Sequence, residues 1–210
     1  MYEKLSDDSF ITIVADCTGH GVPGAFMSLI GYNILSQIIK IQNITDPVGI
    51  LEILSRKLIE VLKQNEEQNS DGMDISICRL DKNGDSYDVS FSGTRCSIYL
   101  YSKAESKLQR IKGSQRQIGW GTEFTKIHQF VLHQFKLTKD DFIVMLSDGL
   151  IDQSNDNRRR FGSERFSEFL ALNSQVSMPQ MGKNLGKTLD QFMNGSPQRD
   201  DITVFGFKIK

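Results

Sequence analysis

The sequence has little of several residues that would mark special classes of protein. It holds 3 cysteines, 4 prolines, 3 histidines and 1 tryptophan in 210 residues. The cysteines, Cys17, Cys78 and Cys96, are odd in number and widely scattered, so neither a disulfide framework nor a structural zinc site is expected. This usage suits a reducing compartment. We therefore expect a cytoplasmic protein, or the cytoplasmic part of a membrane-anchored one.

The sequence also lacks an excess of charge of either sign, since its formal net charge is -1. A duplex-binding protein usually shows a basic face, so no nucleic-acid partner is expected. The run Arg158–Arg160 is interpreted as a solvated turn, with an anion contact for a phosphorylated substrate as the alternative. No signal-peptide pattern opens the chain, and no uninterrupted apolar run is long enough to span a bilayer. Membrane insertion of this chain is therefore not expected.

What is present is the composition of a globular domain. Hydrophobic residues make up 39% and charged residues 24% of the sequence, which is typical of a soluble protein with a buried core. The length suits one large domain, and neither an internal repeat nor a linker-like stretch interrupts it. The sequence therefore predicts a single domain over residues 1–210.

Periodicity predicts both helices and strands in this domain. Apolar residues at steps of three and four predict helices over about 23–42, 47–62, 163–172 and 178–194. Alternating or continuous apolar runs predict strands over 10–15, 75–80, 87–91, 97–101, 108–111, 141–146 and 202–209, with a shorter one within 126–135. Most strands follow one another without an intervening helix. The pattern favours an α+β class with antiparallel sheets over a doubly wound parallel sheet.

Three aspartate segments share one position relative to the predicted strands. Asp16 follows the strand at 10–15, Asp148 follows the strand at 141–146, and Asp200–Asp201 precede the last strand. A carboxylate at the mouth of an apolar strand is costly unless it is hydrogen-bonded, paired or metal-bound. Each aspartate alone could simply cap a turn. Three together favour a site for a hard divalent cation such as Mg²⁺ or Mn²⁺, which binds oxygen ligands.

The same segments resemble a known family. The stretch 16–25, DCTGHGVPGA, is similar to the D-x-x-G-H-G-x-P-A/G-A segment of bacterial PPM-type phosphatases, which are like protein phosphatase 2C. Residues 147–152, SDGLID, and 199–204, RDDITV, resemble two further segments of that family, in the same order and with similar spacing. The similarity is greatest to the subgroup of sporulation stage II protein E. It covers essentially the whole chain.

The resemblance implies a fold, an activity and a ligand set. The fold is a layered α-β-β-α sandwich of antiparallel sheets flanked by helices. The activity is hydrolysis of phosphoserine or phosphothreonine in a protein by a metal-activated water, in bacterial signalling, with a substrate of the anti-sigma-factor antagonist type. Asp16, the backbone carbonyl of Cys17, Asp148 and Asp200 are the implied ligands of two Mg²⁺ or Mn²⁺ ions. No residue is expected to act as a nucleophile.

Four further residues are additional candidates for the site. Asp201, Asp74, His20 and Gly149 are possible additional members of the site. Asp74 could instead cap a strand, and His20 could instead hydrogen-bond to the backbone of its loop. Cys17 is not expected to be a nucleophile, because no basic partner is apparent in the sequence to lower its pKa.

The sequence departs from the family pattern at its beginning. The resemblance implies an earlier strand with another metal-binding aspartate, so we expect that strand, or strands, to be absent from this chain and one metal site to be weakened. An uncovered sheet edge could then pair with a second copy, giving a homodimer, and an N-terminal sensor or regulatory region is expected in the full-length protein. The alternative function is a phosphatase-like binding module with little or no turnover.

Overall fold

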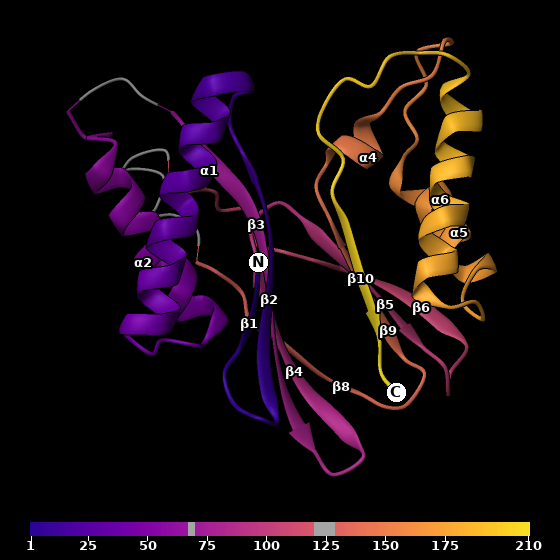
Figure 1. The fold of residues 1–210 in the computed structure, drawn as a ribbon, viewed down its shortest axis with the longest axis horizontal. Helices are drawn as coiled ribbons and strands as arrows, with labels where there is room; N and C mark the ends of the chain where they lie inside the picture. Colours follow the sequence, from indigo (N-terminus) through magenta and orange to yellow (C-terminus); the bar gives the residue numbers. More distant parts are fainter. Residues whose placement is uncertain (67–69, 120–128) are drawn as a thin grey trace. The chain divides into compact units, whose positions relative to one another are not determined.

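A computed structural model describes residues 1–66, 70–119 and 129–210 of the chain. These residues form two compact units, each with its own sheet and helices (Figure 1). Unit 1 comprises Met1–Cys96 and Lys112–Lys136, and unit 2 comprises Ser97–Ile111 and Leu137–Lys210. Each unit is described by itself below.

The sheet of unit 1 is built around two long antiparallel strands. Its order is β1 (Tyr2–Lys4), β2 (Ser9–Cys17), β3 (Gly72–Asn83), β4 (Ser86–Gly93) and β8 (His133–Leu137), and the short β7 (Ile118–Gly119) also pairs with β3. β3 and β4 form a hairpin whose turn contains Gly84 at φ 60°. A glycine adopts this left-handed conformation at little cost.

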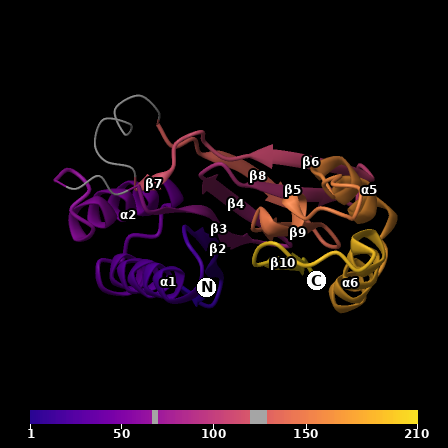
Figure 2. The same ribbon diagram turned by 90° about the horizontal axis from the view of Figure 1, so that it is seen from above.

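Two helices cover one face of this sheet, as Figures 1 and 2 show. They are α1 (Gly21–Ser36), which runs on into a π-helical turn η1 (Gln37–Ile41), and α2 (Pro47–Val61). Asp46 caps α2, because its carboxylate accepts a hydrogen bond from the Gly49 amide at 2.7 Å. The helices bury apolar side chains against Ile11 and Ile13 of β2 and their neighbours on β3. Residues of even number on β2 and β3 therefore point to the opposite face.

The first helical stretch meets a composition test for membrane-spanning helices. By length and composition alone, Gly21–Ile41 could cross a membrane, although polar residues and Lys40 interrupt its apolar run. In this structure, however, the stretch contributes Met27, Ile34, Leu35 and Ile38 to the core of unit 1. A buried core helix passes the same test of length and composition.

Unit 2 has a second antiparallel sheet with helices on one face. Its order is β10 (Val204–Lys208), β9 (Phe142–Leu146), β5 (Ser97–Ser102) and β6 (Lys107–Lys112). The helices are α5 (Ser163–Leu172) and α6 (Met178–Met193), and a single turn α4 (Gly149–Asp152) follows β9. Aromatic rings fill the core: Tyr99 meets Phe166 edge to face, and Tyr101 stacks on Phe142.

The predicted α+β class, with antiparallel sheets flanked by helices, is confirmed. The predicted helices and strands outside residues 126–135 are also present, with ends shifted by a few residues. In that region β8 begins at His133, and residues 126–128 lie outside the described residues. The sequence did not predict β1, β7 and α4, which are only three, two and four residues long. Periodicity needs more residues than that to show a pattern.

Candidate active site

The acidic residues of unit 1 meet across two neighbouring strands. Asp16 on β2 lies directly opposite Asp74 on β3. The Thr18 amide donates to the Gly72 carbonyl across the same two strands. Hydrogen-bonded and non-hydrogen-bonded pairs alternate along an antiparallel ladder, so Asp16 and Asp74, two positions away, are also a hydrogen-bonded pair. Their α-carbons are thus about 5.5 Å apart and their side chains share the face opposite α1 and α2. Two carboxylates so close repel each other unless positive charge compensates them.

Two neighbours hold the carboxylate of Asp74. Thr94 Oγ1 donates to Asp74 Oδ1 at 3.0 Å, and Arg95 Nη2 lies 2.9 Å from Asp74 Oδ2. The hydroxyl of Thr94 is itself fixed by the Ile75 amide, which donates to it at 2.8 Å. Asp74 therefore does more than cap a strand, because its half-buried carboxylate is held by the Thr94 hydroxyl and the Arg95 guanidinium. Arg95 and Thr94 were not singled out from the sequence, since nothing local shows that the β4–β5 turn returns to Asp74.

The end of β2 is also clamped to the start of β3. Thr18 donates from its hydroxyl to Asp71 Oδ1 at 3.1 Å and accepts from the Gly72 amide at 3.0 Å. Its own amide donates to the Gly72 carbonyl at 2.9 Å. These bonds fix the backbone immediately after Asp16 and Cys17. Thr18 therefore positions the first acidic segment, a role the sequence did not reveal.

Cys17 offers its carbonyl rather than its thiol. Since Thr18 and Gly72 form a hydrogen-bonded pair, Cys17 and Met73 form a non-hydrogen-bonded one, and the Cys17 carbonyl points away from β3. The described register of β1 with β2 runs from Phe10 to Thr12 and does not reach Cys17. The pKa of the thiol is raised, chiefly by burial, although a hydrogen bond with Ser28 opposes this. A raised pKa disfavours the thiolate, in keeping with the expectation that Cys17 is not a nucleophile.

The loop from Gly19 to Gly24 joins this segment to α1. Gly19 and Gly21 have φ values of 86° and 65°, and a β-carbon on Gly24 would lie 2.6 Å from the Gly19 carbonyl oxygen. His20 is the N-cap residue of α1, is exposed, and makes no side-chain capping bond. The hydrogen bond expected between His20 and the backbone is thus absent from the described part of the chain.

The acidic residues of unit 2 lie where β9 ends and β10 begins. Asp148 starts the turn α4 and is exposed, and the next residue, Gly149, is buried. A β-carbon on Gly149 would collide with the carbonyl oxygen of Asp201 and would lie 3.5 Å from the Asp200 β-carbon. The glycine after Asp148 is therefore required so that Asp200 and Asp201 can pass close to it.

Hydrogen bonds hold these two segments of unit 2 together. Ser147 donates from its hydroxyl to the Asp201 carbonyl at 3.0 Å and accepts from the Thr203 amide at 3.0 Å. Buried Gln153 donates to the Pro197 carbonyl at 3.0 Å and accepts from the Arg199 amide at 3.2 Å. Gln153 thereby fixes the loop that leads into Asp200. The sequence analysis missed it because its partners lie more than forty residues away.

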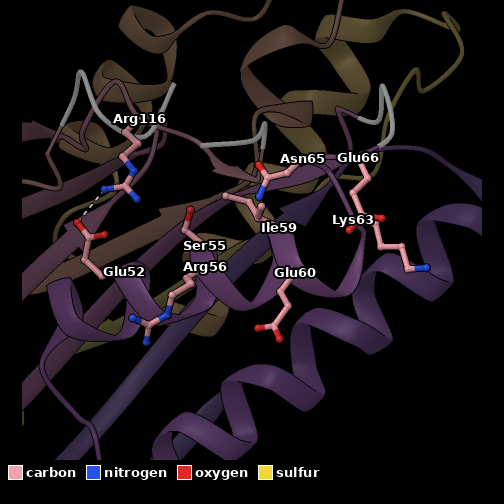
Figure 3. A pocket seen from close by; sticks show the side chains of 9 residues that line it. All are labelled: Glu52, Ser55, Arg56, Ile59, Glu60, Lys63, Asn65, Glu66 and Arg116. Atoms are coloured by element: carbon pink, nitrogen blue, oxygen red, sulfur yellow. Dashed lines mark hydrogen bonds and ion pairs between the residues drawn. The ribbon is translucent and has the colours of Figure 1, made fainter. Parts of the chain in front are cut away.

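A pocket of about 500 Å³ on α2 lies outside this acidic arrangement (Figure 3). It is lined by Glu52, Arg56, Glu60 and Lys63 on successive turns, together with Arg116 and others. The Arg116 side chain, only 9% exposed, pairs with Glu52 at 2.7 Å. None of the predicted site residues lines this pocket.

The donors fit the chemistry of a hard cation. Within unit 1 they are the carboxylates of Asp16 and Asp74 and the Cys17 carbonyl, and within unit 2 the carboxylates of Asp148, Asp200 and Asp201. All are oxygens, as Mg²⁺ and Mn²⁺ prefer. Among residues 1–66, 70–119 and 129–210, no three histidine, cysteine, aspartate or glutamate side chains come together as a ready metal-binding group.

Comparison with known proteins places the chain in a family. The sequence model of stage II sporulation protein E (SpoIIE) matches residues 6–210. The chain belongs to the SpoIIE family. No curated protein sequence matches it. The fold and this membership identify a PP2C/SpoIIE-type serine phosphatase domain of a signalling protein, and hence an enzyme.

Solved structures support the same assignment. The SiaA-PP2C domain of Pseudomonas aeruginosa is 26% identical, with a TM-score of 0.87, and the match covers 100% of this chain and 79% of that one. The PP2C phosphatase domain of SpoIIE from Bacillus subtilis, solved with a fragment of its regulatory domain, is 17% identical with a TM-score of 0.70, over 98% of this chain and 56% of that one. RsbX in complex with magnesium is 14% identical with a TM-score of 0.60, over 100% and 86%. The last two show likeness of fold alone.

Proposed function

We propose that this domain removes phosphate from phosphoserine or phosphothreonine in a protein partner, and that it needs Mg²⁺ or Mn²⁺ to do so. The observation that carries the proposal is the Asp16–Asp74 pair at the end of β2, in a chain that belongs to a phosphatase family. Adjacent carboxylates, with a main-chain carbonyl on the next residue, supply the oxygen ligands that suit a divalent cation. RsbX, a structural neighbour, was solved with magnesium.

The residues proposed to hold the cations are Asp16, the Cys17 carbonyl, Asp148 and Asp200, with Asp74 and Asp201 as additional candidates. When bound, such cations lower the pKa of water and neutralise charge on a phosphoryl group. The chain's own residues supply the rest. Thr18 and Gly149 hold the acidic segments in place, and exposed His20 is proposed to hydrogen-bond to water or to the leaving hydroxyl.

The partner proposed is a phosphorylated signalling protein of the anti-sigma-factor antagonist type, and the proposed location is the cytoplasm. Attachment to a regulatory region belongs to the same proposal, because the SpoIIE structure compared above includes a fragment of its regulatory domain. A homodimer also remains a proposal, for which the size of the protein in solution is the measurement.

Hydrolysis of p-nitrophenyl phosphate with and without Mn²⁺ tests the activity. We expect turnover that depends on Mn²⁺, disappears with a chelator, and is abolished by Asp148→Ala. Asp156→Ala, which removes an exposed aspartate of unit 2 in the 155–160 turn, is the matched control and should retain full turnover. Turnover that survives Asp148→Ala would contradict the ligand assignment. Binding of a phosphoprotein without turnover would favour the alternative, a binding module.

A further inference from the structure

Arg95 occupies a special position beside the acidic pair of unit 1. It lies in the turn between β4 and β5, and its Nη2 is 2.9 Å from Asp74 Oδ2 while its Nε is 3.4 Å from Asp74 Oδ1. With its amide oxygen turned toward Arg95, Gln117 accepts from the same Nε at 3.2 Å. The Arg95 side chain is 56% exposed and that of Asp74 is 17% exposed. The guanidinium is therefore a partly exposed cation that pairs with a more deeply buried anion.

Arg95 bonds to the same carboxylate oxygens of Asp74 that would coordinate a metal ion. Asp74 Oδ1 already accepts from Thr94 and from Arg95 Nε, and Oδ2 accepts from Arg95 Nη2. A carboxylate has about four lone-pair positions, so few remain for a cation while Arg95 stays in place. Arg95 also supplies the positive charge that relieves repulsion between Asp74 and Asp16, which is what a divalent cation would do.

We propose that Arg95 is a positioning residue that competes with a divalent cation for Asp74 and, once displaced, binds the phosphoryl group of the substrate. This inference rests on the proposed function. A guanidinium matches the geometry of phosphate oxygens and can bind two of them at once. Because the Arg95 guanidinium contacts the Asp74 carboxylate, it would lie close to a phosphoryl group if a cation at Asp74 bound one. No covalent step involves Arg95.

Equilibrium binding of Mn²⁺, followed by the electron paramagnetic resonance of the free ion without substrate, tests the competition. We expect Arg95→Ala to bind Mn²⁺ about threefold more tightly, the size typical of removing an exposed ion pair. Arg95→Ala should not tighten Mn²⁺ binding in an Asp74→Asn background, because Arg95 and the cation then have no carboxylate at position 74 to compete for. Arg79→Ala is the matched control, since Arg79 pairs with Asp81 at 2.9 Å on the same strand but away from Asp16, and it should leave the affinity unchanged.

Inhibition by inorganic phosphate in the presence of Mn²⁺ tests the second half. Arg95→Ala should raise the inhibition constant about tenfold. Arg95→Lys should raise it less, because lysine keeps the positive charge but cannot bind two phosphate oxygens as a guanidinium does. Unchanged Mn²⁺ affinity in Arg95→Ala, or a gain that persists with Asp74→Asn, would overturn the competition. An unchanged inhibition constant would overturn the phosphate contact.

Failure of the Arg95 proposal and failure of the proposed function would give different results. If neither the wild-type protein nor Arg95→Ala binds Mn²⁺, the metal site itself is wrong. If the wild-type protein binds Mn²⁺ and loses it with Asp148→Ala but not with Arg95→Ala, the metal-dependent function stands whatever the result for Arg95. Circular dichroism of each variant separates loss of binding from loss of fold.

Discussion

The carbonyl oxygen of Asp201 lies against the α-carbon of Gly149, in the space that any other residue would fill with its β-carbon. This contact brings the two acidic segments of unit 2 together, because Asp148 precedes the glycine and Asp200 precedes the carbonyl. The glycine is thus required by the arrangement of the site rather than by its own torsion angles.

Gly149→Ala should therefore damage both stability and activity. We expect the free energy of unfolding to fall by about 2 kcal/mol, because a new methyl group must displace backbone rather than a flexible side chain. Chemical denaturation measures the loss, and p-nitrophenyl phosphate measures turnover. Gly186→Ala is the control: it lies within α6, its β-carbon would meet nothing within 4 Å, and the change should stabilise by about 0.5–1 kcal/mol. Equal behaviour of the two variants would contradict the assigned contact.

Gln153 should contribute to both stability and metal binding, because it anchors the loop that leads into Asp200. Gln153→Ala removes a buried amide that bonds both the Pro197 carbonyl and the Arg199 amide, and we expect a loss of about 1–3 kcal/mol. Mn²⁺ affinity should fall as well, because the loop before Asp200 loses its anchor. Gln180→Ala, on the exposed surface of α6, should change neither quantity. Unaltered stability and Mn²⁺ affinity in Gln153→Ala would contradict the claim that Gln153 anchors this loop.

Asp81 should make stability depend on pH in the acid range. Burial raises the pKa of Asp81, but hydrogen bonds from Arg79 and Ser9 outweigh it and hold the pKa below its ordinary value. A depressed pKa in the folded state stabilises at pH values above the ordinary carboxyl pKa of about 3.9, and this contribution is lost as the pH falls through the lower folded value. Asp81→Asn should thus lower the melting temperature at pH 7 and have little effect near pH 2. A constant difference at all pH values would contradict this assignment.

Asp46 should contribute to α2 through its capping bond alone. Asp46→Ala is expected to reduce the free energy of unfolding by about 1 kcal/mol, because the Gly49 amide then has no intrahelical partner. Asp46→Ser, which can also cap, should retain most of the stability, and thermal unfolding distinguishes the two variants.

Much of the fold could be predicted from the sequence, for reasons visible in particular segments. Strands such as 142–146 are continuous apolar runs, and α2 has both a cap and a broad apolar stripe. The acidic segments were found because three aspartates follow or precede such strands. The contacts around them were not, because Thr94, Arg95 and Gln153 act through tertiary hydrogen bonds that leave no periodic pattern. His20 was expected to bond to the backbone, and its exposed ring shows that loop geometry is not readable from residue type alone.

Binding of Mn²⁺ measured by isothermal titration calorimetry tests the central claim most directly. The account predicts that the wild-type protein binds Mn²⁺ and that Asp16→Asn and Asp200→Asn, one in each unit, each weaken the binding at least about tenfold, since each removes a charged ligand. Asp7→Asn, which alters only an exposed pair with Lys4, should bind as the wild type does. Wild-type affinity in both Asp16→Asn and Asp200→Asn would contradict the claim that these carboxylates are ligands of bound Mn²⁺.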